Sequence, residues 1–169
     1  QQAVDMLLKG VEQAFDLSRE DPKTLARYDT RGFLNPSWWT EPTGHKKSND
    51  RWYRAHANTL GKQLLLARRL CEAGCGFITV TTEFVWDFHA DPNKVGIEEG
   101  KRIVIDPFDH AVSAFIEDCE ARGLSDQILL VCCGEMGRTP KINGNGGRDH
   151  WGGLAPLLLS GGGLKMGQV

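Results

Sequence analysis

Three short segments in the second half of the chain contain the side chains best suited to bind a metal ion and an anion. They are residues 86–89 (WDFH), 134–140 (GEMGRTP) and 147–151 (GRDHW), and their candidate residues are Asp87, His89, Glu135, Arg138, Asp149 and His150. Carboxylate oxygens and imidazole nitrogens are ligands that suit zinc, manganese or magnesium. Such ions assist hydrolysis of phosphoryl and sulfuryl esters, either singly or in pairs. An arginine such as Arg138 can bind an anionic oxygen through two parallel hydrogen bonds.

The same residue types have ordinary structural roles. Asp87 and Asp149 are typical caps of helices and turns. Arg138 can form an ion pair with Glu135 or Asp149, and a loop histidine is often simply hydrogen-bonded. Spacing alone does not separate a metal site from such a network, so both interpretations stand at this point.

The glycine-rich stretches do not indicate a nucleotide site. Residues 144–147 (GNGG) and 161–163 (GGG) match neither G-x-G-x-x-G nor G-x-x-x-x-G-K-[ST]. The first stretch leads to Asp149 and His150 rather than to a helix. We therefore expect no nucleotide cofactor, and we expect glycines that let the backbone turn tightly beside the site.

Hydrophobic periodicity predicts the elements that position these segments. Helical spacing of apolar residues predicts helices over residues 3–16, 22–28, 51–73 and 106–122. Apolar or β-branched runs predict strands over residues 76–83, 128–133 and 154–159. Residues 29–50 are predicted to form a loop or insertion. This alternation is typical of an α/β fold with a mainly parallel sheet flanked by helices, in which ligands bind beyond the carboxyl ends of the strands.

Composition limits the classes of partner. The chain has 169 residues, a net charge of −2, 40% hydrophobic residues and 25% charged residues, which is ordinary for one globular domain. This charge does not favour nucleic-acid binding. No apolar run approaches the roughly 20 residues of a membrane span. We expect a partner such as an anionic small-molecule ester, no nucleic acid and no membrane span.

Longer strings resemble a known family. The strings WDFHAD, GEMGRTP, GRDHW, LGKQLLLARRLCEAGCGFITV and LLLSGGGLKMGQV closely resemble DUF1501 proteins, which are grouped with the alkaline-phosphatase-like and sulfatase-like superfamily. The resemblance covers nearly the whole chain except the loop at 29–50. It implies that residues 1–169 are the middle and later part of an alkaline-phosphatase-like domain. Such a part is expected to be catalytically incomplete and to associate with other material, either the remainder of the domain or another copy.

The resemblance also implies roles for the candidate residues. The metal region would be surrounded by Asp87, His89, Glu135, Asp149 and His150, with zinc, manganese or another divalent ion as cofactor. Arg138 would hold the anion. Met136 stands where the superfamily has a histidine ligand, so one ion or none is as consistent with the residues as two.

Two functions follow from the resemblance. The first is a metal-dependent phosphate- or sulfate-ester hydrolase whose nucleophile comes from an earlier strand of the domain. The alternative is a non-catalytic exported binding or surface-assembly protein on the same fold. Export is implied only because family members often carry export signals.

Overall fold

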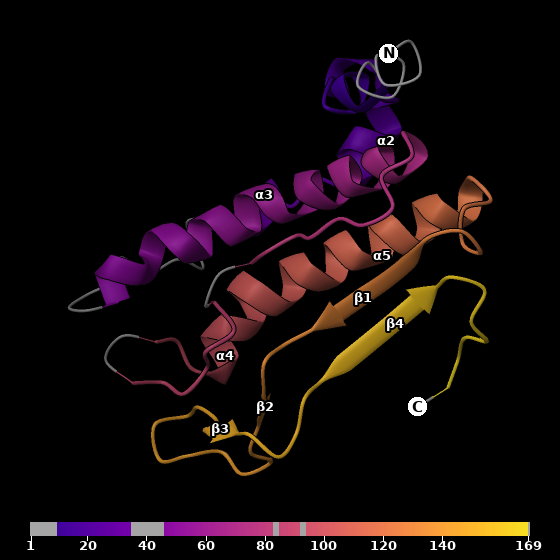
Figure 1. The fold of residues 1–169 in the computed structure, drawn as a ribbon. Helices are drawn as coiled ribbons and strands as arrows, with labels where there is room; N and C mark the ends of the chain where they lie inside the picture. Colours follow the sequence, from indigo (N-terminus) through magenta and orange to yellow (C-terminus); the bar gives the residue numbers. More distant parts are fainter. Residues whose placement is uncertain (1–9, 35–45, 83–84, 92–93, 169) are drawn as a thin grey trace.

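A computed structural model describes residues 10–34, 46–82, 85–91 and 94–168 (Figure 1). Residues 10–14 are helical. The helical elements that follow are η1 (Leu17–Arg19), α2 (Pro22–Arg27), η2 (Arg31–Leu34), α3 (Lys46–Glu72), α4 (Ile97–Gly100), the π-helical η3 (Lys101–Ile105) and α5 (Asp106–Ala121). The strands are β1 (Leu129–Cys133), β2 (Gly137–Arg138), β3 (His150–Trp151) and β4 (Leu157–Gly161). The structure is therefore α/β in the general sense, as expected.

The long helices α3 and α5 lie side by side and form the main core (Figure 1). Leu64 and Leu65 of α3 belong to the same buried cluster as Ala111 and Phe115 of α5. Each helix ends at a glycine in the left-handed region, Gly74 with φ 94° and Gly123 with φ 68°, a conformation that other residues adopt only with strain. The predicted helices over 51–73 and 106–122 are thus confirmed in their main parts. The prediction for residues 3–9 lies outside the described part of the chain.

The helical regions extend further than periodicity predicted. Helix α3 begins at Lys46, inside the segment expected to be a loop, and η2 forms a helical turn in the same segment. Residues 35–45 of that segment lie outside the described residues. Helix α5 is preceded without a break by α4 and η3, so helical structure starts at Ile97. The helix at 22–28 is confirmed as α2, and Asp21 caps it by accepting a hydrogen bond from the Thr24 amide.

The described strands pair antiparallel, which corrects the expectation of a mainly parallel sheet. Strand β1 pairs with β4, with Val131 opposite Leu159, and β2 pairs with β3. Leu130 and Cys132 point toward the main core, but Leu129 and Val131 on the other face are 48% and 49% exposed. The continuous apolar run therefore forms a strand with one covered face, whereas the expected sheet flanked by helices would be covered on both faces.

Two other strand predictions need correction. Residues 76–82 form no strand in the described structure, and residue 83 lies outside it. The segment runs back along α3 and α5 without a backbone ladder, with Val80 against the core and Phe77 90% exposed (Figure 1). Its β-branched composition favours extended backbone, but no described strand lies beside it to pair with. The strand predicted over 154–159 begins only at Leu157.

An ion-pair network joins the N-terminal region to both long helices. The Glu20 carboxylate contacts Arg68 and Arg69 of α3 and, from its other oxygen, Arg122 at the end of α5. Arg68 and Arg122 also contact Asp118. Arg68 and Glu20 are both buried, and buried charges are tolerated when they are paired in this way.

Among the described residues, none of the helices combines the length and the apolar character that crossing a bilayer requires.

Candidate metal centre

The segment 85–89 presents two candidate ligands, Asp87 and His89, among apolar residues that pack into the protein. Val85 and Phe88 are buried in a second core cluster, and Trp86 packs against that cluster. The Trp86 ring also makes an edge contact with Phe108 of α5 at a centroid distance of 5.0 Å. These apolar anchors fix the backbone, so that Asp87 and His89 face the opposite side.

The hairpin of β2 and β3 brings the other polar side chains to the same place. Arg138 and His150 are cross-strand partners in this two-residue ladder. The Arg148 amide donates to the Phe88 carbonyl at 2.9 Å, which docks the hairpin onto the segment 85–89. Gly147 permits this contact, because a Cβ there would lie 2.3 Å from the His89 carbonyl carbon.

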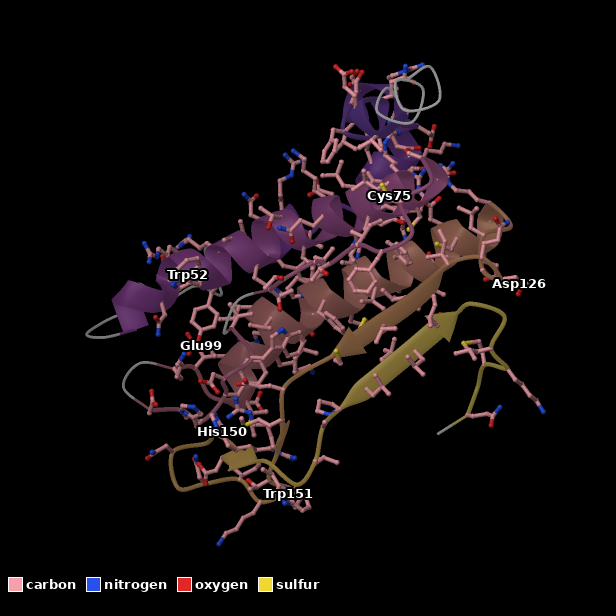
Figure 2. The ribbon with its side chains drawn as sticks, in the orientation of Figure 1. Trp52, Cys75, Glu99, Asp126, His150 and Trp151 are labelled. Atoms are coloured by element: carbon pink, nitrogen blue, oxygen red, sulfur yellow. The ribbon has the colours of Figure 1, made fainter. Side chains whose placement is uncertain are left out.

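Asp87, His89 and His150 form a compact group of candidate ligands. Each offers one ligand atom, and these atoms all lie within 4.8 Å of one another. The Nε2 atom of His150 is 2.7 Å from Asp87 Oδ1, and the Nε2 atom of His89 is 3.2 Å from the same oxygen. The two imidazole rings lie 5.0 Å apart. The group is at one end of the molecule, where Figure 2 labels His150, and Asp126 is at the other end.

His89 is oriented by a second carboxylate. Its Nδ1 atom lies 2.9 Å from Asp91 Oδ2. An ionised carboxylate only accepts hydrogen bonds, so Nδ1 carries the proton in this arrangement. The Nε2 atom of His89 faces the Asp87 oxygen. Metal-binding histidines commonly hold their other ring nitrogen against an outer carboxylate in this way.

Two cations balance the Asp87 carboxylate. Arg138 Nη2 donates to Oδ1, and the Lys94 ammonium is 3.5 Å from Oδ2. Partial burial by itself would raise the pKa of Asp87. The hydrogen bonds from Arg138 and His150 outweigh burial and hold the pKa of that carboxyl far below its usual range. Asp87 is therefore ionised at neutral pH, as a metal ligand must be.

The spacing of the three ligand atoms fits a small divalent ion. Zinc bonds to nitrogen and oxygen are about 2.0–2.2 Å long, and a tetrahedral site therefore separates its ligand atoms by about 3.4 Å. The two nitrogen-to-oxygen distances here are 2.7 and 3.2 Å. Opening these two distances to that size takes changes of about 0.7 and 0.2 Å, and all three ligand atoms already lie within 4.8 Å of one another. Two imidazoles and one carboxylate would leave at least one coordination position for another ligand.

Comparison with known proteins gives a family but no activity. The family model described as "Protein of unknown function (DUF1501)" matches residues 1–169. The chain belongs to the DUF1501 family. A search of curated proteins and a search of solved structures each returned no match. For this DUF1501 chain, the geometry of the site is thus the main source of functional information.

The structure unites only part of the ligand set expected from the sequence. Glu135 and Asp149 are exposed and lie outside the group of three. Asp149 instead accepts a hydrogen bond from the Asn143 side chain at 3.0 Å. Arg138 pairs with Asp87 rather than with either of the two acids named as its alternatives.

The sequence alone did not indicate two charged residues of this site, Asp91 and Lys94. Asp91 follows His89 by two residues in the quoted WDFHAD string, and this spacing was the available signal. Lys94 follows three residues later and carried no distinguishing signal, because a single lysine in a loop is common. Its contact with Asp87 becomes visible only in the folded chain.

Proposed function

We propose that the chain supplies the metal site of a phosphate- or sulfate-ester hydrolase and binds one divalent metal ion through Asp87, His89 and His150. The observation that supports this most is the convergence of three ligand atoms within 4.8 Å of one another, from segments about 60 residues apart in sequence. The His89–Asp91 pair adds the outer carboxylate that such sites often have.

The donor set determines the chemistry we expect. Two imidazoles and a carboxylate suit zinc, manganese or another divalent ion, and the open coordination positions would polarise an ester oxygen or water. Arg138, which already points into the site, would bind the anionic part of the ester. A single ion is favoured because Glu135 and Asp149 lie outside the compact group. Glu135 and Asp149 would then contact the substrate or the hairpin rather than the metal ion.

Metal titration of the purified, chelator-treated protein tests the site. We expect one zinc or manganese ion per chain by isothermal titration calorimetry. Asp91→Asn should weaken binding by roughly 10–100-fold, the usual cost of losing an outer partner, and His150→Gln should weaken it further. His150 is partly exposed, so its replacement should leave the fold intact by circular dichroism.

Asp126→Asn serves as the matched control, because this exposed aspartate lies far from the site (Figure 2). Its metal affinity should equal that of the wild type. Absence of stoichiometric binding, or full affinity in His150→Gln, would refute the proposed site. In the full-length protein, which would include the earlier strand with the nucleophile, metal-dependent release of p-nitrophenol from p-nitrophenyl phosphate or sulfate, lost in His150→Gln, would then establish the reaction.

A second function is favoured by a separate observation. The outer face of the β1–β4 sheet exposes Leu129, Val131, Leu157 and Leu159. An exposed apolar face of this kind often marks an interaction surface. We propose as the alternative that the protein is a non-catalytic binding or assembly protein on the same scaffold. A protein that self-associates and takes up no metal would support this alternative against the hydrolase.

We also propose that residues 1–169 belong to one alkaline-phosphatase-like domain. Helices α3 and α5 share the main core, and Trp86 beside the second core cluster contacts Phe108 beside the main one, which supports one folding unit. Limited proteolysis tests the unity of the domain: a single protected core is expected, and two independently stable fragments would argue against it.

A further inference from the structure

We propose that Arg138 changes partners, pairing with Asp87 when no metal is bound and with a phosphate or sulfate dianion when a divalent ion occupies Asp87. Metal and dianion would then bind cooperatively, each increasing the affinity for the other. This inference rests on the proposed function, because it concerns the same metal site.

Competition at one oxygen atom is the first reason. Asp87 Oδ1 accepts from Arg138 Nη2 and also faces the Nε2 atoms of His89 and His150. A carboxylate oxygen offers about two lone-pair positions. A metal ion held by the two imidazoles would bind this same oxygen, which both imidazoles already face. Its positive charge would lie beside the Arg138 guanidinium, and this repulsion would weaken the Arg138 hydrogen bond.

The guanidinium would stay at the site after losing this bond. Arg138 Nη1 donates to the Arg148 carbonyl at 3.2 Å, and Nη2 donates to the Trp86 carbonyl at 3.1 Å. These two backbone acceptors belong to the two segments that build the site, and metal binding does not use them. The N–H released from Asp87 would remain held toward the metal position, where it can donate to a bound anion.

Charge balance gives the second reason. Asp87 and Asp91 supply two negative charges, and Arg138 and Lys94 supply two positive charges. With neutral imidazoles this cluster has no net charge. A divalent ion would bring it to two positive charges, in a partly buried place where charges are poorly screened. A tetrahedral dianion would restore neutrality, and Arg138 is the cation released to receive it.

The test measures zinc affinity with and without a dianion. A chromophoric chelator competes for Zn²⁺ in buffer containing either sodium sulfate or sodium chloride at equal ionic strength. We expect sulfate to tighten zinc binding by about tenfold, within the roughly 5–150-fold range common for coupled sites. By linkage, zinc should tighten sulfate binding by the same factor.

Arg138→Gln separates the exchange from a purely structural role. In chloride this variant should bind zinc more tightly than the wild type, because the competitor for Asp87 has been removed. In sulfate it should show no further gain. If Arg138 only supported the loops through its carbonyl contacts, the same variant would bind zinc more weakly in both buffers, and the proposal would be overturned.

Arg148→Gln is the matched control. It removes one positive charge from the same hairpin, but the Arg148 side chain donates to the Thr139 carbonyl rather than to Asp87. Its sulfate effect should stay close to that of the wild type, whereas loss of the effect would point to general electrostatics and reject the partner exchange.

The outcomes separate this inference from the proposed function. If the wild type binds no zinc, or if His150→Gln binds it normally, the metal site itself is wrong. If zinc binds at Asp87 and His150 but sulfate has no effect, or if Arg138→Gln keeps the effect, the metal site stands and only the exchange fails.

Discussion

Replacing Glu20 by glutamine should produce a large and acid-dependent loss of stability. The side chain is only 6% exposed. One carboxylate oxygen lies 2.6 Å from Arg68 Nη2 and 2.8 Å from Arg69 Nη1, and the other lies 3.0 Å from Arg122 Nη2. Burial alone would raise the pKa of Glu20, but the hydrogen bonds from Arg69 and Arg68 outweigh burial and lower it to about 2.

The pKa shift sets the size of the effect. A pKa lowered from 4.5 to about 2 corresponds to about 3 kcal/mol of stability at neutral pH, since one unit is worth roughly 1.4 kcal/mol. Because the folded-state pKa of Glu20 is depressed, this stability is present above pH 4.5 and is lost as the pH falls toward 2. At pH 3 only about 1.4 kcal/mol would remain.

Urea unfolding followed by circular dichroism, in chelator, measures the difference. At pH 7 the midpoint of Glu20→Gln should fall by about 1.5 M, given an m value of about 2 kcal/mol/M. The difference in midpoint between variant and wild type should narrow to about 40% of that value at pH 3. Arg68 stays buried in the variant and loses a charged partner, which adds to the loss at neutral pH.

Glu117→Gln is the matched control. Glu117 also pairs with an arginine, Arg27 at 2.8 Å, but its side chain is 62% exposed. Solvent screens such a pair, so the control should lose less than about 1 kcal/mol. Equal losses in the two variants, or a Glu20→Gln gap that stays constant between pH 7 and pH 3, would refute the reasoning.

Two further predictions concern the site and the core. Gly147→Ala should reduce zinc affinity at least about tenfold in the calorimetric titration, because the new Cβ would collide with the His89 carbonyl. Gly144→Ala, where no atom lies within 4 Å of the added Cβ, should bind zinc normally, and equal effects would show that the contact does not hold the site. Leu65→Ala should lower the free energy of urea unfolding by about 2–5 kcal/mol, because Leu65 is 1% exposed in the core. Leu157→Ala on the exposed sheet face should cost under about 1 kcal/mol, and a comparable loss would mean that this face is covered in solution.

The helices could be predicted from the sequence because their signals are local. The periodic leucines of α3 and the Asp21-Pro22 start of α2 act within a few residues, and both helices are present. The π-helical η3 and the early start at Ile97 were missed. Both lie before residue 106, where the helix predicted from apolar spacing begins.

The candidate site was predicted only as a set of segments. Strand ends and polar strings pointed to Asp87, His89 and His150, and the fold brings these three together. The exposed positions of Glu135 and Asp149 and the contacts of Lys94 depend on the path of the loops, which residue types alone do not specify.

By itself, the sequence determined the family, the α/β character, the two core helices and the neighbourhood of the site. Tertiary structure alone decided that β1 pairs antiparallel with β4, that residues 76–82 stay unpaired in the described structure, and that Arg138 contacts Asp87. The physical reason is the distance along the sequence over which each kind of interaction acts. Helical periodicity and capping depend on residues a few positions apart, whereas strand pairing and ion pairing depend on which distant segments the packed core brings into contact.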